Sequence, residues 1–275
     1  MRRRLVILLC GTVASSVEAA DIAPPPQAPA PPDWIITVGA DARIVPLYMG
    51  SNKWGPLALP NLAWRRAASP EPFSSARDGI GIALFDNGVI ALGPVGSFIF
   101  PRRQSYSSTL SGLGNIGMTY EIGGFIDYWA VPWLRTRVEV LQGFGAADGL
   151  IANFAADAVI PISEDVTLSG GPRARIVSAG MEAPYFSINQ TQSIASGLPL
   201  YSAGGGWQAV GAGTQLKYRF NPSWATYGFV EYDKLLGPTA SSPIVREPGG
   251  SPNQWKFGVG LTYSFAMHAW PVDAR

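Results

Sequence analysis

The fold is decided by the stretch WKFGVGLTYSF at residues 255–265, in which every second residue is large and apolar. Successive residues of a β-strand point to opposite faces of the sheet. The odd positions therefore place six apolar side chains, from Trp255 to Phe265, on one face, and the even positions place lysine, glycine, threonine and serine on the other. An apolar outer face opposite a small, polar inner face is typical of a strand in a transmembrane β-barrel.

The same alternation recurs along the chain. In residues 34–44 the apolar positions are the even ones, from Trp34 to Ile44, and they oppose Thr37, Asp41 and Arg43. Residues 118–128, 134–140, 166–176 and 210–219 repeat it. Period-two patterns in so many separate stretches indicate a sheet of many strands. We therefore predict an all-β protein, a closed antiparallel transmembrane β-barrel over residues 34–265.

The connections between strands are of two kinds. Short turn signals lie at residues 86–88, 131–133, 163–165 and 221–223, and we expect these turns on the periplasmic side. Longer Gly- and Pro-rich stretches near 101–116, 177–205 and 237–253, with a shorter connection at 144–149, are the expected extracellular loops.

The strand count follows from this spacing. Strands are expected near residues 39, 61, 82, 93, 123, 139, 155, 171, 212, 229 and 260. Single-chain outer-membrane barrels have even strand counts, so we predict twelve strands, with ten as the fallback. The missing strand is expected within residues 46–78, and residues 73–78 are the candidate.

The composition of the 275 residues agrees with this architecture. The chain contains 32 glycines and only 14% charged residues, and its mean hydropathy is +0.13. Beyond the N-terminus no run of 18 apolar residues appears, so a membrane-spanning helix is not expected.

The first nineteen residues are typical of a cleaved signal peptide. Three arginines at positions 2–4 precede an apolar stretch from Leu5 to Val13, and a cleavage site follows Ala19. The alternative, an N-terminal anchor, is disfavoured because the apolar stretch is too short to cross a bilayer. The single cysteine, Cys10, lies in this stretch behind Leu9, which makes lipidation a weak alternative. Cleavage leaves a chain without cysteine, and so without disulfides.

The mature chain has no basic excess. Removing three arginines and Glu18 with the signal changes the formal charge from +1 to −1, so a nucleic-acid partner is not expected. The segment 20–33, which contains PPPQAPAPP, is expected to be an extended periplasmic tether, with a Pro-rich recognition motif as the alternative.

The inward positions of the predicted strands carry charges of both signs. The basic ones are Arg43, Arg135, Arg137, Arg173, Arg175, Lys217, Arg219 and Lys256, and the acidic ones are Asp41, Glu121, Asp127, Glu139 and Asp157. A charge in a narrow lumen must be matched or solvated, and we favour pairing across the lumen. The alternative is a small, mildly anion-favouring pore.

Catalytic signals are weak. A histidine is the usual general base, and the one histidine, His268, follows the last predicted strand. Glu231 and Asp233 share a strand face beside Lys234, and a solvated lumen cluster is the favoured interpretation. The glycines at 204–206 precede a strand rather than a helix, so they do not form a phosphate-binding loop. The sequence predicts neither an enzyme nor a cofactor or metal site.

Several short motifs, in their order along the chain, resemble the MipA/OmpV family of outer-membrane proteins. They are PLYMGS at 46–51, LP at 59–60, SGLGNI at 111–116, YF at 185–186, SGLP at 196–199 with Tyr201, SPIV at 242–245 and LTYSF at 261–265. The family is named for interaction with a lytic transglycosylase, MltA. The resemblance implies a non-catalytic barrel in the outer membrane of a Gram-negative bacterium, which scaffolds a murein hydrolase and a murein synthase. Some members are regarded as porin-like.

Two features depart from the family pattern. Pro101-Arg102-Arg103 replaces the family's Gly-Arg after the fourth strand, and a tail at 266–275 follows the final aromatic residue. Gly260, Tyr263 and Phe265 still fit the terminal-strand signal for barrel assembly that the resemblance implies. We rank an envelope scaffold first and a small outer-membrane pore for polar or anionic solutes second.

Overall fold

The computed structural model describes residues 33–69 and 71–268. The expected signal peptide, nearly all of the tether and the end of the tail lie outside these residues. The described residues belong to one compact unit. No helix within them is both long and apolar enough to span a membrane.

The described chain contains twelve strands, as predicted. They are β1 Trp34–Pro46, β2 Trp54–Arg66, β3 Ile80–Gly81, β4 Phe85–Asp86, β5 Ile90–Ile99, β6 Thr119–Val131, β7 Leu134–Gly145, β8 Gly149–Pro161, β9 Val166–Val177, β10 Gly206–Arg219, β11 Trp224–Leu235 and β12 Asn253–Met267. Helices are α1 Ala179–Phe186, α2 Gln190–Ser196, α3 Gly237–Ser241 and α4 Pro243–Arg246, with 3₁₀ turns at Gln104–Tyr106 and Ser108–Leu110.

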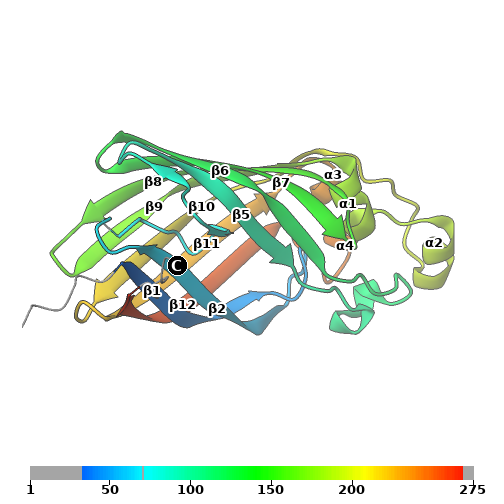
Figure 1. Ribbon diagram of the computed structural model, residues 1–275. Coiled ribbons are helices and arrows are strands. Elements are labelled where there is room, and N and C mark those ends of the chain that lie inside the picture. The colour runs from blue at the N-terminus through cyan, green and yellow to red at the C-terminus, as the bar shows by residue number, and fades with distance from the viewer. Residues whose placement is uncertain (1–32, 70, 269–275) are drawn as a thin grey trace, which may run out of the picture. The chain divides into compact units, whose positions relative to one another are not determined.

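The strands form one antiparallel sheet curled into a barrel (Figure 1). Sequential neighbours pair from β5 to β12, and β12 then pairs with β1, from Trp34 opposite Met267 to Ile44 opposite Phe257. The sheet continues from β1 to β2 and from β5 to β3 and β4. No ladder of the described residues joins β2 to β3 or β4, so the barrel is nearly closed and has a seam at this place.

Residues 73–86 differ from the prediction. The strand expected near residue 82 is split into the two-residue strands β3 and β4, both paired with β5. The strand expected at 73–78 is absent, because this segment has no ladder partner and its backbone bonds to side chains inside the barrel.

The predicted alternation is confirmed. Outward residues such as Val259 and Ile122 are 64% and 60% exposed, whereas the inward neighbours Glu121 and Asp127 are buried. Tyr232, Trp255 and Phe257 form part of an aromatic outer surface, with the first two rings 4.8 Å apart. An apolar exterior of this kind suits contact with lipid.

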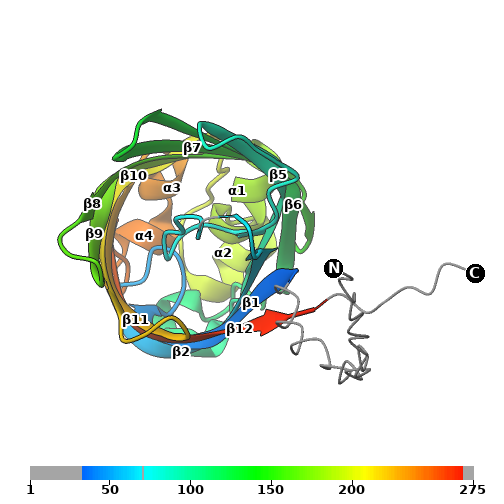
Figure 2. The same cartoon turned by 60° about the vertical axis from the view of Figure 1, so that its left-hand side comes forward.

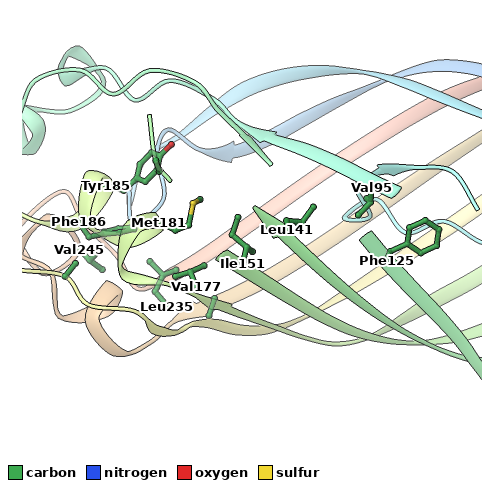
Figure 3. Packing of buried hydrophobic residues seen from close by; sticks show 13 residues of the cluster. Val95, Phe125, Leu141, Ile151, Val177, Met181, Tyr185, Phe186, Leu235 and Val245 are labelled. Carbon is green, nitrogen blue, oxygen red and sulfur yellow. The ribbon is translucent and has the colours of Figure 1, made fainter. Parts of the chain in front are cut away.

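The two ends of the barrel differ. The turn end carries the short connections at 87–89, 132–133, 162–165 and 220–223, and the loop end carries the long ones at 100–118, 178–205 and 236–252. All four helices lie at the loop end (Figure 1). There Met181 and Phe186 of α1 and Val245 of α4 pack beside the wall residues Ile151 and Val177 (Figure 3). The long loops therefore form a packed cap.

Candidate functional site

The barrel interior is crossed by residues 71–79, which we call the lumen segment. In the view along the barrel, this cyan coil lies within the ring of strands (Figure 2). The backbone N–H of Ala76 donates to Gln215 Oε1 at 2.9 Å, and Gln215 Nε2 donates to the Ser74 carbonyl at 3.1 Å. The N–H of Gly79 donates to Glu139 Oε1 at 3.3 Å. Side chains of the wall thus replace the ladder partners that a strand would have.

Ion pairs at three residues join the lumen segment to the wall, and two of these residues are the neighbours Arg77 and Asp78. Arg77 Nη1 donates to both carboxylate oxygens of Asp233 on β11, at 2.7 and 2.9 Å. Asp78 accepts from Arg135 on β7 at 2.8 and 3.1 Å. Arg135 uses two guanidinium nitrogens, which match the carboxylate of Asp78 in distance and direction, so this contact fixes orientation as well as charge.

The wall itself carries a network of ion pairs. Arg135 and Arg173 both donate to Asp157 on β8, at 2.8 and 2.5 Å. Arg137 donates to Asp127 and Glu139, each at 2.8 Å. These six groups come from β6 to β9, which places matched charges side by side along the inner wall.

Two further pairs of inward charges lie on the wall. Arg175 donates to Glu121 at 2.6 Å. Arg43 pairs with Asp41 on the same strand. Asp41 also accepts from the Tyr227 hydroxyl at 3.1 Å.

The basic residues nearest the ends of the lumen are more exposed. Lys256 lies 3.1 Å from Asp233 and 3.7 Å from Glu231. Lys217 pairs with Glu71 of the lumen segment. Arg219 lies at the turn end with 44% of its side chain exposed, 3.7 Å from Asp165, and so not within the lumen network.

Sequence reasoning missed the most connected part of this site. The predicted strand at 73–78 includes Arg77 and Asp78, and no periodic pattern marks them as groups that reach across the barrel. Glu231 and Asp233 share an inward face, but their cationic partners are Lys256 on the neighbouring strand and, for Asp233, Arg77, rather than Lys234. Both carboxylates are therefore matched by cations inside the barrel.

The expected assembly residues lie on β12. Tyr263 and Phe265 point outward, each 38% exposed, and their rings are 6.1 Å apart. Gly260 faces inward, where an added Cβ would lie 2.3 Å from the ring of Tyr227. A side chain at 260 would therefore displace that ring. The role of the three residues in assembly stays a prediction.

The described residues contain no group of three or more His, Cys, Asp or Glu side chains arranged to hold a metal ion. His268 is the last residue that the structure describes, directly after β12.

The cap brings together the short motifs of the long loops. Tyr48, Leu113 and Ile244 belong to one buried cluster, together with Leu110 and Ile188. Ser242 donates to the Phe186 carbonyl at 2.8 Å and links α3 and α4 to α1. The motif residues of the loops therefore pack against one another at the loop end.

One buried carboxyl joins the cap to the wall. Glu182 of α1 accepts from Thr239 of α3 and from Gln208 Nε2 of β10, the latter at 3.3 Å. Only 1% of Glu182 is exposed, and burial raises its pKa although both hydrogen bonds favour the charged form. Within the described chain, Glu182 Oε2 and Gln208 Oε1 have no hydrogen-bond donor.

A cavity of about 1,380 Å³ remains beside the lumen segment. Its lining includes Arg43, Arg77 and Arg137 from the charged network and Leu57, Leu59 and Phe100 from the two sides of the seam. The interior is therefore partly filled and not wholly closed.

Solved barrels show a similar strand arrangement at low sequence identity. The NanC porin is 10% identical and aligns over 84% of this chain and 98% of its own, with a TM-score of 0.41. The KdgM porin is 11% identical over 84% and 99%, with a TM-score of 0.38. The outer membrane protein OprG from Pseudomonas aeruginosa is 11% identical over 87% and 98%, with a TM-score of 0.31.

No curated protein matches this chain in sequence. A family model described as "MltA-interacting protein MipA" matches residues 38–265, which run from β1 to β12 and include every motif of the cap. The chain belongs to the MltA-interacting protein MipA family.

Proposed function

We propose that this chain is a non-catalytic scaffold in the outer membrane, which holds a lytic transglycosylase of the MltA type and, with it, a murein synthase. The family name supports the hydrolase as the partner. The apolar exterior of the barrel supports a place in a membrane, and the pairing of β1 with β12 agrees with a single-chain barrel.

The observation that carries the proposal is the occupied lumen. The lumen segment is bonded to β7, β10 and β11 through Asp78, Gln215 and Arg77. An open diffusion pore would need these contacts to be broken, and breaking a buried ion pair leaves an uncompensated charge. A barrel whose lumen is filled by fixed internal contacts is a poor path for solutes. Its exposed ends are better suited to bind other proteins.

The partner surface is expected at the turn end. The signal peptide predicted for residues 1–19 would place the N-terminus in the periplasm, and the antiparallel order then places the short turns there too. Murein lies on that side of the outer membrane. Glu164 and Asn221 are exposed in two of these turns.

Site-specific crosslinking in cells tests this proposal. A photoreactive amino acid at Glu164 or Asn221 is expected to crosslink a lytic transglycosylase, identified by mass spectrometry. The matched control is Ile194 on α2, which is 76% exposed at the opposite end of the barrel. Crosslinks to murein enzymes from Ile194 alone, or from none of the three sites, would contradict the proposal.

A small pore is the second candidate because of the cavity of about 1,380 Å³ beside the lumen segment. Polar and charged groups line part of it, as an aqueous path would require.

A further inference from the structure

The seam leaves one side of β2 without a strand partner. β2 pairs with β1 over its full length, from Trp54 opposite Pro46 to Arg66 opposite Trp34. On the other side of the seam, β3 covers β5 only at Val95 and Gly96. The end of β5, residues 97–99, has no ladder partner but β6 among the residues that the structure describes. A window therefore lies between the loop-end halves of β2 and β5.

The sequence of β2 agrees with an edge. Pro56 and Pro60 both lie within this strand. Proline has no N–H to donate to a ladder and is largely confined to edge strands in sheets. An edge inside a membrane is unusual, because lipid cannot satisfy exposed backbone groups. The two prolines reduce the number of backbone donors that the window exposes.

The cavity reaches this window from inside. Leu57 and Leu59 line it from the inner face of β2, and Phe98 and Phe100 line it from the end of β5. Its volume of about 1,380 Å³ exceeds the range of about 300–1,000 Å³ that is common for small-molecule sites. The wall of the cavity beside the window is thus apolar, and the cavity is large enough for a lipid-sized molecule.

One end of the same cavity carries a buried cation without an anion. Arg102 is 5% exposed, and its Nη1 donates to the Tyr185 carbonyl. In the described chain no carboxylate lies within 4.0 Å of its guanidinium, and its Nε has no acceptor. Arg135, Arg173 and Arg175 also leave Nε without an acceptor, but each of them pairs with a carboxylate.

An unmatched buried guanidinium is costly, and burial lowers the pKa of Arg102 to about 10. Its place in the cavity lining puts it where a ligand could supply the missing negative charge.

We propose that the cavity binds a single-chain anionic amphiphile from the membrane, with its carboxylate at Arg102 and its chain beside the window. A tail-less anion would match Arg102 but leave the walls at Leu57, Leu59 and Phe100 in contact with water. An uncharged lipid would cover those walls and leave the guanidinium unmatched. The cap covers the loop end, so the window is the direct route for a molecule dissolved in the bilayer.

Photolabelling of the full-length protein in phosphatidylcholine nanodiscs tests this inference. The probe is a sixteen-carbon fatty acid with a diazirine in mid-chain. Labelled residues are expected in 54–66 and 96–103, with excess oleate reducing the labelling at least about tenfold. Oleyl alcohol lacks the charge and acetate lacks the chain, so both are expected to compete at least about tenfold more weakly than oleate, a difference of about 1.4 kcal/mol.

Arg102→Gln is expected to reduce labelling at these residues at least about tenfold at a limiting probe concentration. Arg246→Gln changes an exposed arginine of α4 that does not line the cavity, and it is expected to label like the parent protein. If Arg102→Gln does not fold, Leu59→Trp blocks the cavity from β2, with the outward Leu261→Trp as its control. Labelling spread uniformly around the barrel would overturn the proposal, as would equal competition by oleate and oleyl alcohol.

Discussion

Asp78 and Arg135 form a two-bond ion pair between the lumen segment and β7, with N–O distances of 2.8 and 3.1 Å. Their side chains are 8% and 1% exposed. Arg135 also donates to Asp157, so the pair connects the lumen segment to the network of the wall.

The first prediction is that Asp78→Asn destabilises the barrel. Arg135 keeps Asp157, so we expect a loss of about 2 kcal/mol in the free energy of unfolding, below the roughly 3–5 kcal/mol found when a buried charge loses its partner. Urea unfolding in phosphatidylcholine vesicles, followed by tryptophan fluorescence, measures it. Asp165→Asn is the control because Asp165 is exposed beside Arg219, and we expect a change within about 0.5 kcal/mol. Equal losses in the free energy of unfolding for both variants would show that the internal ion pair stabilises the barrel no more than the exposed pair does.

The second prediction concerns pH. Burial raises the pKa of Glu182 in the folded protein, so the folded state binds a proton more tightly than the unfolded chain does. This contribution to stability is complete below the unfolded pKa of about 4.3 and is lost as pH rises through the folded pKa.

Glu182→Gln removes that titration. Relative to the parent protein, the variant is expected to gain stability as pH rises above about 4.3, because it keeps an uncharged side chain beside Thr239 and Gln208. Urea midpoints from pH 4 to 8 measure the difference. Glu164→Gln changes an exposed turn residue and is expected to follow the parent at every pH. A constant difference between Glu182→Gln and the parent would refute the assignment.

The third prediction tests the outer surface. Val259 lies near the middle of β12 and is 64% exposed, so we expect Val259→Arg to cost about 2–4 kcal/mol, as a cation costs at the bilayer midplane. Ile194 is even more exposed, but it lies on α2 beyond the wall. Ile194→Arg is therefore expected to change stability by less than about 0.5 kcal/mol. The same vesicle assay compares them, and a similar cost at both positions would argue against lipid contact at Val259.

The wall of the barrel was predictable because its signal is local. Side chains alternate with period two along one strand, so Val259 and Gly260 can be assigned to opposite faces from their neighbours alone. The charges at Arg137 and Asp127 follow from the same rule, since both fall on inward positions and are directly opposite in the ladder.

The interior and the cap were not predictable in this way. Arg77 and Asp233 are 156 residues apart, and nothing periodic relates them. Leu110 and Ile244 belong to Gly- and Pro-rich loops that resemble solvated connections, yet both are fully buried because the loops pack on each other. Such contacts depend on how the chain closes in space, which a one-dimensional pattern does not encode.

The last prediction concerns conductance, because it separates the scaffold from the pore. Arg77→Ala combined with Asp78→Ala removes the less exposed ion pairs of the lumen segment. We expect the parent protein to show no long-lived channels in planar bilayers and the double variant to show them, since the segment then loses its strongest contacts with β7 and β11. Lys217→Ala, which breaks only the half-exposed pair with Glu71, is the control and is expected to stay closed. Stable channels in the parent protein would favour the pore, and a folded double variant without channels would show that the segment does not control the lumen.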